Sequence, residues 1–326
     1  MEEVPLNTKK TSSGTNFVQR CVSKLKQAFC RKVTEYGPPT DGKKKPKTKL
    51  KTRSLAVTDI HSVKSLFDVP ACTPGFEKPN SGKRVRETTP SFSSWKGYHT
   101  LFLPHNWSST SKRTYPAIFE YPGNEWAKGE VDESTGLPEG CKMGYGLSGG
   151  GQDFIWVSLP FLDKNTKNVA TFWWGDANAT TSYCIATAKY ICDAYGGDPG
   201  RLFLAGFSRG AIACNYIGLR NDAIASLWKG MVLYSHYDGI RKWNYPESSE
   251  KDAVRRLKRL GNTPQLITQE WGTDLTQKFL KKNHPKGSFT FISVPYPNHN
   301  DIWLSKDIPE AEDARDWIRR VAGFTG

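Results

Sequence analysis

The chain has 326 residues, of which 37% are hydrophobic and 12% aromatic, and it carries a formal net charge of +14 at pH 7. This length is sufficient for one large domain with a single core. Because no apolar run approaches the length of a membrane span, we expect no transmembrane helix.

Residues 1–90 differ in charge from the rest of the chain. They hold 19 lysines and arginines against 8 acidic residues, whereas residues 91–326 are close to neutral. Apolar residues recur at helical spacing over 16–33, and a lysine-rich block occupies 43–53. We therefore expect a basic, largely disordered extension with an amphipathic helix over 16–33.

The basic extension has three interpretations. It is a candidate for binding an anionic membrane surface or a partner protein. It is equally explained as a solubilising tail, and the helix over 16–33 also suits packing against the domain that follows.

Targeting signals give little information about the compartment. The chain opens with Met-Glu-Glu, which is unlike the basic-then-apolar start of a signal peptide. Seven scattered cysteines favour a reducing compartment. We therefore expect a cytoplasmic protein or one peripheral to a membrane.

The second domain, expected over 91–326, opens with strands near 98–103 and 116–121. The glycines of residues 144–149 match a dinucleotide fingerprint, but they precede the apolar strand 153–159 instead of following one. We interpret them as a mobile loop between strands. With no Walker, His-Glu-x-x-His or EF-hand pattern either, we expect no metal, no cofactor and no specific nucleic-acid site.

The most informative segment begins at residue 201. An apolar strand runs into Gly206-Phe-Ser208-Arg-Gly210, and a helix of small and apolar residues follows. This order is typical of a nucleophile elbow, in which the glycines permit a tight turn and the serine is presented at the start of a helix. Ser208 is therefore the predicted nucleophile.

An acid and then a histidine must follow such a serine in the chain. Asp274, after the predicted strand 264–270, is our first choice for the acid, although an aspartate before a helix is also a common N-cap. Asp238 and Glu270 remain as alternative acids. His299 follows the last predicted strand, 289–295, and is the predicted general base.

At this point the chain resembles a family. The segment Tyr98-His-Thr-Leu-Phe-Leu-Pro, the Tyr115-Pro strand and the elbow preceded by Asp198-Pro-Gly-Arg look like the polyhydroxybutyrate depolymerase and feruloyl esterase group of α/β-hydrolases. The resemblance covers about residues 95–325 and is specific only around the elbow. That family is largely secreted, so it leaves a secreted protein as an alternative.

The resemblance implies an oxyanion hole built from two backbone N–H groups. One belongs to Arg209, directly after the nucleophile. The other comes from the loop after the second strand, where this chain has Tyr121-Pro-Gly-Asn-Glu in place of the family's usual His-Gly. We assign that donor to Asn124, with Glu125 as the alternative.

Strands and helices alternate along the second domain. Strands are also predicted at 168–173, 201–205 and 230–235, and helices at 177–195, 209–219, 250–260, 274–282 and 309–322. This alternation predicts an α/β-hydrolase fold, with a mostly parallel sheet flanked by helices.

The sequence thus predicts a serine hydrolase of carboxylic esters. Tryptophans at predicted strand ends suit an aromatic or polymeric substrate. A catalytically silent hydrolase scaffold used for binding remains an alternative, as does a serine peptidase or acyltransferase with the same triad.

Overall fold

The computed structural model describes residues 59–125, 134–270 and 272–325 of the chain. The predicted helix over 16–33 and the lysine block over 43–53 lie outside these residues. Within the described residues, no helix is both long enough and apolar enough to cross a membrane.

The fold centres on an eight-stranded mixed sheet with the strand order β1-β2-β4-β3-β7-β8-β9-β10. The first three strands in this order pair antiparallel, and all later pairs are parallel. The strands are β1 (Arg84–Glu87), β2 (His99–Phe102), β3 (Tyr115–Tyr121), β4 (Ile155–Ser158), β7 (Gly197–Phe207), β8 (Trp228–Tyr234), β9 (Gln265–Glu270) and β10 (Phe289–Val294).

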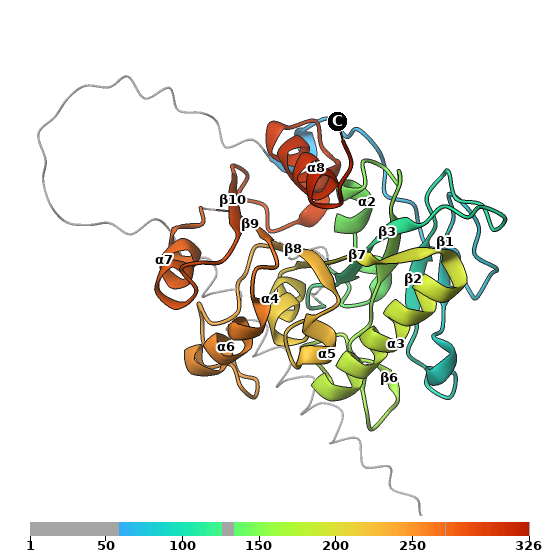
Figure 1. Ribbon diagram of the computed structural model, residues 1–326. Helices are drawn as coiled ribbons and strands as arrows, with labels where there is room; N and C mark the ends of the chain where they lie inside the picture. Colours follow the sequence, from blue (N-terminus) through green and yellow to red (C-terminus); the bar gives the residue numbers. More distant parts are fainter. Residues whose placement is uncertain (1–58, 126–133, 271, 326) are drawn as a thin grey trace, which may run out of the picture. The chain divides into compact units, whose positions relative to one another are not determined.

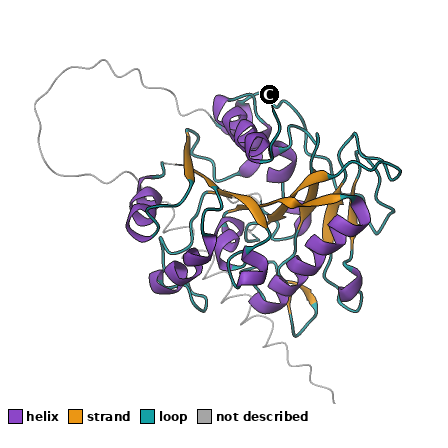
Figure 2. Cartoon of the chain, in the orientation of Figure 1, coloured by secondary structure: helices purple, strands orange, loops and turns teal. Residues whose placement is uncertain are grey.

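Helices cover both faces of this sheet (Figure 1). Helices α2 and α8 lie on one face, and helices α3, α4, α5 and α6 lie on the other. The bounds are α2 (Met143–Leu147), α3 (Ala177–Tyr195), α4 (Arg209–Tyr216), α5 (Asp222–Ala225), α6 (Glu250–Leu257), α7 (Asp274–Asn283) and α8 (Pro309–Val321). This layered arrangement, visible in Figure 2, is the α/β architecture expected from the alternation of strands and helices.

The core follows from the apolar strands. Ile118, Phe203 and Val232 are fully buried in the central strands and belong to the same apolar cluster as Trp317 and Ile318 of α8. A sheet buried on both faces needs strands that are apolar throughout, and β3 is buried at all of its seven positions. Burying each large apolar side chain contributes about 1.5–3 kcal/mol.

The folded part of the chain begins before the expected boundary at residue 91. Strand β1 pairs with β2, and Ile60 is buried in the main core. The buried guanidinium of Arg84 donates hydrogen bonds to Pro138 O (2.9 Å), Cys141 O (3.2 Å) and the hydroxyl of Ser158 (3.1 Å). Residues 59–90 therefore include structural parts of the domain.

The glycines of residues 144–149 were expected to form a mobile loop, but Gly144 and Gly146 lie within helix α2 and Gly149 lies in the turn that follows it. Glu120 of β3 accepts hydrogen bonds from the backbone N–H groups of Lys142, Met143 and Gly144 at 2.8–3.0 Å. This carboxylate satisfies three of the free N–H donors at the start of the helix. A Cβ at Gly144 would overlap the indole of Trp156, so the glycine serves close packing.

The predicted strand over 168–173 is also different in the structure. Only Asn168–Val169 form a strand (β6), paired with Leu162–Asp163 (β5) in a separate two-stranded sheet. The carbonyls of Ala170 and Trp173 accept hydrogen bonds from the Arg209 side chain. The carbonyls at this end of the segment thus bond to a side chain and not to a neighbouring strand.

Candidate active site

Ser208 lies at the sharp turn between strand β7 and helix α4. Its backbone has φ 54° and ψ −115°, a conformation that non-glycine residues rarely adopt. The Ser208 N–H donates to Tyr234 O of the neighbouring strand at 3.0 Å, which holds the turn against the sheet. A strained backbone at this point indicates a functional position.

The two glycines of the elbow are required by close packing. A Cβ at Gly206 would overlap the carbonyl of Gly210, and a Cβ at Gly210 would overlap the carbonyl of Tyr121 at the end of β3. The start of α4 can therefore approach both its own strand and the loop after β3. This approach puts the Arg209 N–H near the loop expected to supply the second oxyanion donor.

The structure brings His299 together with Glu270. The Nδ1 atom of His299 lies 2.5 Å from Oε1 of Glu270, and both side chains are largely buried. Burial raises the pKa of Glu270, but the charge of His299 and its hydrogen bond outweigh this effect, so the carboxyl pKa is lowered overall. Glu270 is therefore held as a carboxylate against the imidazole.

The sheet register explains this pairing. Glu270 is the last residue of β9 and is paired with Val294, the last residue of β10. The chain then returns within five residues to His299, in the loop before the 3-10 helix Asp301–Ser305. The His299 ring also packs on Phe207, with ring centroids 4.7 Å apart. The histidine thus lies beside the elbow, at the carboxyl ends of the parallel strands.

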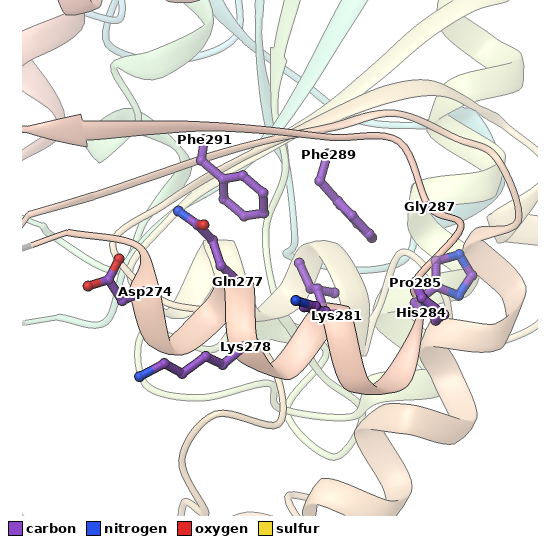
Figure 3. Close-up of a pocket in the computed structure, with 10 residues that line it drawn as sticks. Asp274, Gln277, Lys278, Lys281, His284, Pro285, Gly287, Phe289 and Phe291 are labelled. Atoms are coloured by element: carbon purple, nitrogen blue, oxygen red, sulfur yellow. The ribbon is translucent and has the colours of Figure 1, made fainter.

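Asp274, our first choice for the acid, is the first residue of α7 and is exposed to solvent. It lines a cavity between α7 and β10 together with Lys278 and Phe291 (Figure 3). Neither His299 nor Ser208 lines this cavity. Among the candidate acids it is Glu270, one of the two alternatives, that contacts the histidine.

Asp238, the other alternative, has a structural partner. Its carboxylate accepts hydrogen bonds from Nε (2.9 Å) and Nη2 (3.1 Å) of Arg256, and both side chains are buried. Arg256 also donates to Glu247 O at 3.0 Å. This two-point ion pair joins α6 to the segment after β8 and uses both oxygens of the carboxylate.

Hydrogen bonds in the loop after β3 reduce the number of backbone N–H groups that could serve as the second oxyanion donor. The Glu125 N–H donates to Thr171 O at 2.9 Å, so that group is already used. Asn124 is buried, and its side-chain oxygen accepts from the Trp173 N–H at 2.9 Å. Asn124 and Gly123 are therefore the residues whose backbone N–H groups remain candidates. The Arg209 N–H, at the first position of α4, has no acceptor within its own helix.

The Arg209 side chain fixes the loops around this region. Its guanidinium is buried, lies 4.0 Å from the ring centroid of Phe161, and donates to Gly123 O (2.8 Å), Gly136 O (3.2 Å) and Trp173 O. Burial lowers the pKa of this guanidinium well below its ordinary value. Sequence reasoning assigned a role to the backbone of Arg209 only, because nothing in the sequence showed where its side chain would lie.

Aromatic rings connect the two sides of the candidate site. Trp173 has a left-handed backbone (φ 53°), and its ring centroid lies 5.6 Å from that of Trp243 and 5.0 Å from that of Tyr245. Trp243 in turn packs on His236 at 5.5 Å, and His236 packs on His299 at 5.3 Å. Trp126 and Trp271, two of the tryptophans expected in loops near strand ends, lie outside the described residues.

Sequence reasoning missed Ser235 and His236 as parts of this cluster. The Ser235 hydroxyl lies within hydrogen-bond distance of both His236 and His299. Their position directly after β8 was the available signal, since the residues that end parallel strands gather at one edge of the sheet. Over the described ranges, no group of three or more His, Cys, Asp or Glu side chains is arranged to hold a metal ion.

Comparisons with known proteins address the fold. No protein-family model matches the chain, and no curated protein matches it. The structure is similar to that of puromycin hydrolase, with a TM-score of 0.50 and 10% identity over 75% of this chain and 40% of that one. An S-formylglutathione hydrolase from Agrobacterium tumefaciens has a TM-score of 0.47 and 13% identity, over 74% of this chain and 94% of that one. A thermostable esterase has a TM-score of 0.44 and 13% identity, over 73% of this chain and 62% of that one.

The chain spans less than two thirds of the length of the thermostable esterase and less than half of puromycin hydrolase. At these identities the likeness concerns the fold. The strand order, the arrangement of helices on both faces and the similarity to puromycin hydrolase together identify an α/β-hydrolase fold.

Proposed function

We propose that the protein is a serine hydrolase of carboxylic esters with Ser208, His299 and Glu270 as its catalytic triad. The observation that carries the proposal is the 2.5 Å contact between Glu270 Oε1 and His299 Nδ1 beside the elbow of Ser208. A carboxylate on Nδ1 keeps the proton there and leaves Nε2 to act as the base.

The reaction proceeds in two halves. The Ser208 oxygen attacks the ester carbonyl carbon while His299 Nε2 takes the serine proton, and that proton then passes to the leaving alcohol. Water attacks the resulting acyl-enzyme, again with His299 as the base, and releases the carboxylic acid and Ser208. Glu270 stabilises the imidazolium formed in each half.

The oxyanion of each tetrahedral intermediate is assigned to backbone donors. The Arg209 N–H is one, and the Asn124 N–H is our choice for the other. Arg209 holds the carbonyl of Gly123, so its side chain supports the same loop from behind. Donors fixed before the reaction are typically worth about 10²–10³-fold in rate each.

We further propose that the ester carries an aryl or other flat apolar group. The partly exposed ring of Trp173 packs on the buried rings of Trp243 and Tyr245, and together they form an aromatic wall from the loop of Asn124 to the ring of His236. Flat rings stack favourably on such a wall. A long polymer with apolar units would use the same surface.

The reaction class is tested by hydrolysis of a soluble aryl ester. Ser208→Ala should lower kcat by at least about 10³-fold, because it removes the nucleophile. Ser226→Ala, which changes an exposed serine outside the site, should match the wild type. Equal activity of Ser208→Ala and the wild type would refute the triad, and faster cleavage of the matched anilide would favour a peptidase.

Substrate preference is tested with Trp173→Ala. The ratio of kcat/KM for an aryl ester to that for an ethyl ester should fall about tenfold, since an aromatic contact is lost. Trp107→Ala is the matched control, because Trp107 is also partly exposed but bonds to Tyr195 O away from the site. An unchanged ratio in Trp173→Ala would show that the aromatic wall does not contact the substrate.

A further inference from the structure

Ser235 occupies an unusual backbone position directly after β8. Its φ is 82°, in the left-handed region that disfavours residues with a Cβ. Its N–H donates to Thr268 O at 2.8 Å, and its carbonyl accepts from Gln269 Nε2 at 3.2 Å. Two contacts from β9 therefore hold a strained serine in place, and such strain commonly marks a functional role.

The Ser235 side chain bridges two histidines. Its Oγ lies 2.9 Å from Nδ1 of His299 and 2.8 Å from Nδ1 of His236. The same His299 nitrogen lies 2.5 Å from Glu270. Glu270, His299, Ser235 and His236 thus form one continuous chain of hydrogen-bonding groups.

We propose that Ser235 is a positioning residue for the catalytic histidine, accepting from His299 Nδ1–H and donating its own proton to His236 Nδ1. This inference rests on the proposed triad. It adds two residues to it, neither of which touches the substrate in the reaction described above. It also assigns the tautomer of His236, with its ring proton on Nε2.

The direction of each hydrogen bond follows from counting protons. As the base, His299 must keep Nε2 free of a proton, so its one proton is on Nδ1 and is shared between Glu270 and Ser235. Ser235 can then only accept from His299. Its single hydroxyl proton has His236 Nδ1 as the remaining partner among the described contacts of this oxygen.

The surroundings keep His236 neutral. Burial, together with the charges of His299 and Arg241, lowers its pKa to about 3, although the charge of Glu270 opposes this shift. Among the described residues, three charged groups lie around the rings of His236 and His299. They are Glu270 on β9, Asp301 two residues after His299, and Arg241, which lies over the ring of Trp243. Lys142 of α2 pairs with Asp301 at 3.6 Å. A neutral His236 presents a lone pair to Ser235 throughout the working range of the triad.

The consequence is a second acceptor for the imidazolium. When His299 Nε2 takes the proton of Ser208, the Nδ1–H of His299 is stabilised by the carboxylate of Glu270 and by the Ser235 hydroxyl, which His236 polarises. The ring plane is fixed by the same two contacts. Because the gain is largest when His299 is charged, it should appear in kcat and leave KM unchanged.

Three variants separate this role from packing. Ser235→Ala and His236→Phe should each lower kcat about tenfold and move the acidic limb of the kcat/KM profile to lower pH, with KM unchanged. His236→Asn places an amide oxygen near the position of Nδ1 and should restore most of both effects. Equal losses in His236→Phe and His236→Asn, or wild-type values in Ser235→Ala, would refute the proposal. Ser235→Gly, which relieves the backbone strain, provides the same test if Ser235→Ala does not fold.

The deciding experiment reads a protonation state directly and needs no turnover. Proton–nitrogen correlation spectra of wild-type protein labelled with ¹⁵N-histidine should show His236 with a bonded proton on Nε2 and an unprotonated Nδ1 at neutral pH. A proton on Nδ1 of His236 would overturn the proposal even if the enzyme is active. Conversely, the predicted tautomer in a protein without esterase activity would refute the function and leave the hydrogen-bond chain intact.

Discussion

Glu270 and His299 are 29 residues apart in the chain, and their side chains meet at 2.5 Å at the carboxyl ends of β9 and β10. The contact is on Nδ1, the nitrogen that must carry the proton if Nε2 is to act as a base. Glu270 ends strand β9, whereas Asp274 begins helix α7. Of the two, Glu270 therefore lies at the carboxyl end of the strands, where the loop that carries His299 passes.

The identity of the acid is testable by matched amides. Glu270→Gln should lower kcat by about 10³–10⁴-fold, because the amide cannot hold the required tautomer or stabilise the imidazolium. Asp274→Asn should retain nearly full activity, since Asp274 is exposed on α7. Steady-state kinetics on one soluble aryl ester measure kcat for both variants. A large loss of kcat in Asp274→Asn would show that Asp274 is the triad acid.

The same pair predicts a dependence of stability on pH. The pKa of Glu270 is lowered in the folded state by His299, despite the opposing effect of burial. The stabilisation from this carboxylate should therefore be complete above the ordinary glutamate pKa and be lost as pH falls through the lowered one.

The measurement is the difference in unfolding free energy between the wild type and Glu270→Gln, followed from about pH 6 to about pH 3. We expect the advantage of the wild type to shrink as the pH falls. An advantage that grows with acidity would mean that the pKa of Glu270 is raised in the folded protein.

Asp238 should affect stability and not the chemistry. Removing one partner of a buried ion pair typically costs about 3–5 kcal/mol, because the other charge stays buried without compensation. Asp238→Asn should therefore lower the unfolding free energy strongly in urea denaturation, while kcat per folded molecule stays near the wild-type value.

The control for this prediction is an exposed pair. Lys189 and Asp193 form an ion pair on the surface of α3, where water screens both charges. Asp193→Asn should leave the denaturation midpoint unchanged. A loss of kcat in Asp238→Asn with unchanged stability would make Asp238 part of the catalytic machinery.

Truncation tests where the folded domain begins. A chain that starts at residue 59 should fold and hydrolyse soluble esters at the wild-type rate. It would lose 14 basic and 4 acidic residues, so any binding to heparin should weaken, and in the full chain that binding should decrease with added salt.

A chain that starts at residue 91 should not fold. It lacks strand β1 and Arg84, whose guanidinium satisfies the carbonyls of Pro138 and Cys141. Circular dichroism of the two truncated chains distinguishes them. A folded, active chain from residue 91 would show that residues 59–90 are dispensable.

Local patterns predicted much of the fold. The small residues around Ser208 require a tight strand-to-helix turn, and helix α3 over Ala177–Tyr195 has the predicted bounds because Asp176 caps its start and Gly196 ends it. Strand β1 was missed because its four residues, Arg-Val-Arg-Glu, are mostly charged. Arg84 is buried there only because acceptors from residues 138–158 surround it, which no local pattern could show.

The site was less predictable than the fold for the same reason. Ser208 belongs to a short motif, whereas the partner of His299 depends on the register of β9 and β10. Asp274 fitted the expected order of residues, but an aspartate at the start of a helix is stabilised there by the helix itself. Ser235 and His236 carry no motif, and their contacts appear only when β8, β9 and the last loop are brought together.

The central claim is that Ser208 is an activated nucleophile, and a fluorophosphonate probe tests it most directly. Peptide mapping by mass spectrometry of the labelled, folded wild type should place a single phosphonyl group on Ser208, and folded His299→Ala should take up the label far more slowly. A folded wild type that takes no label, or carries it on another residue, would contradict the claim and favour a hydrolase scaffold used for binding.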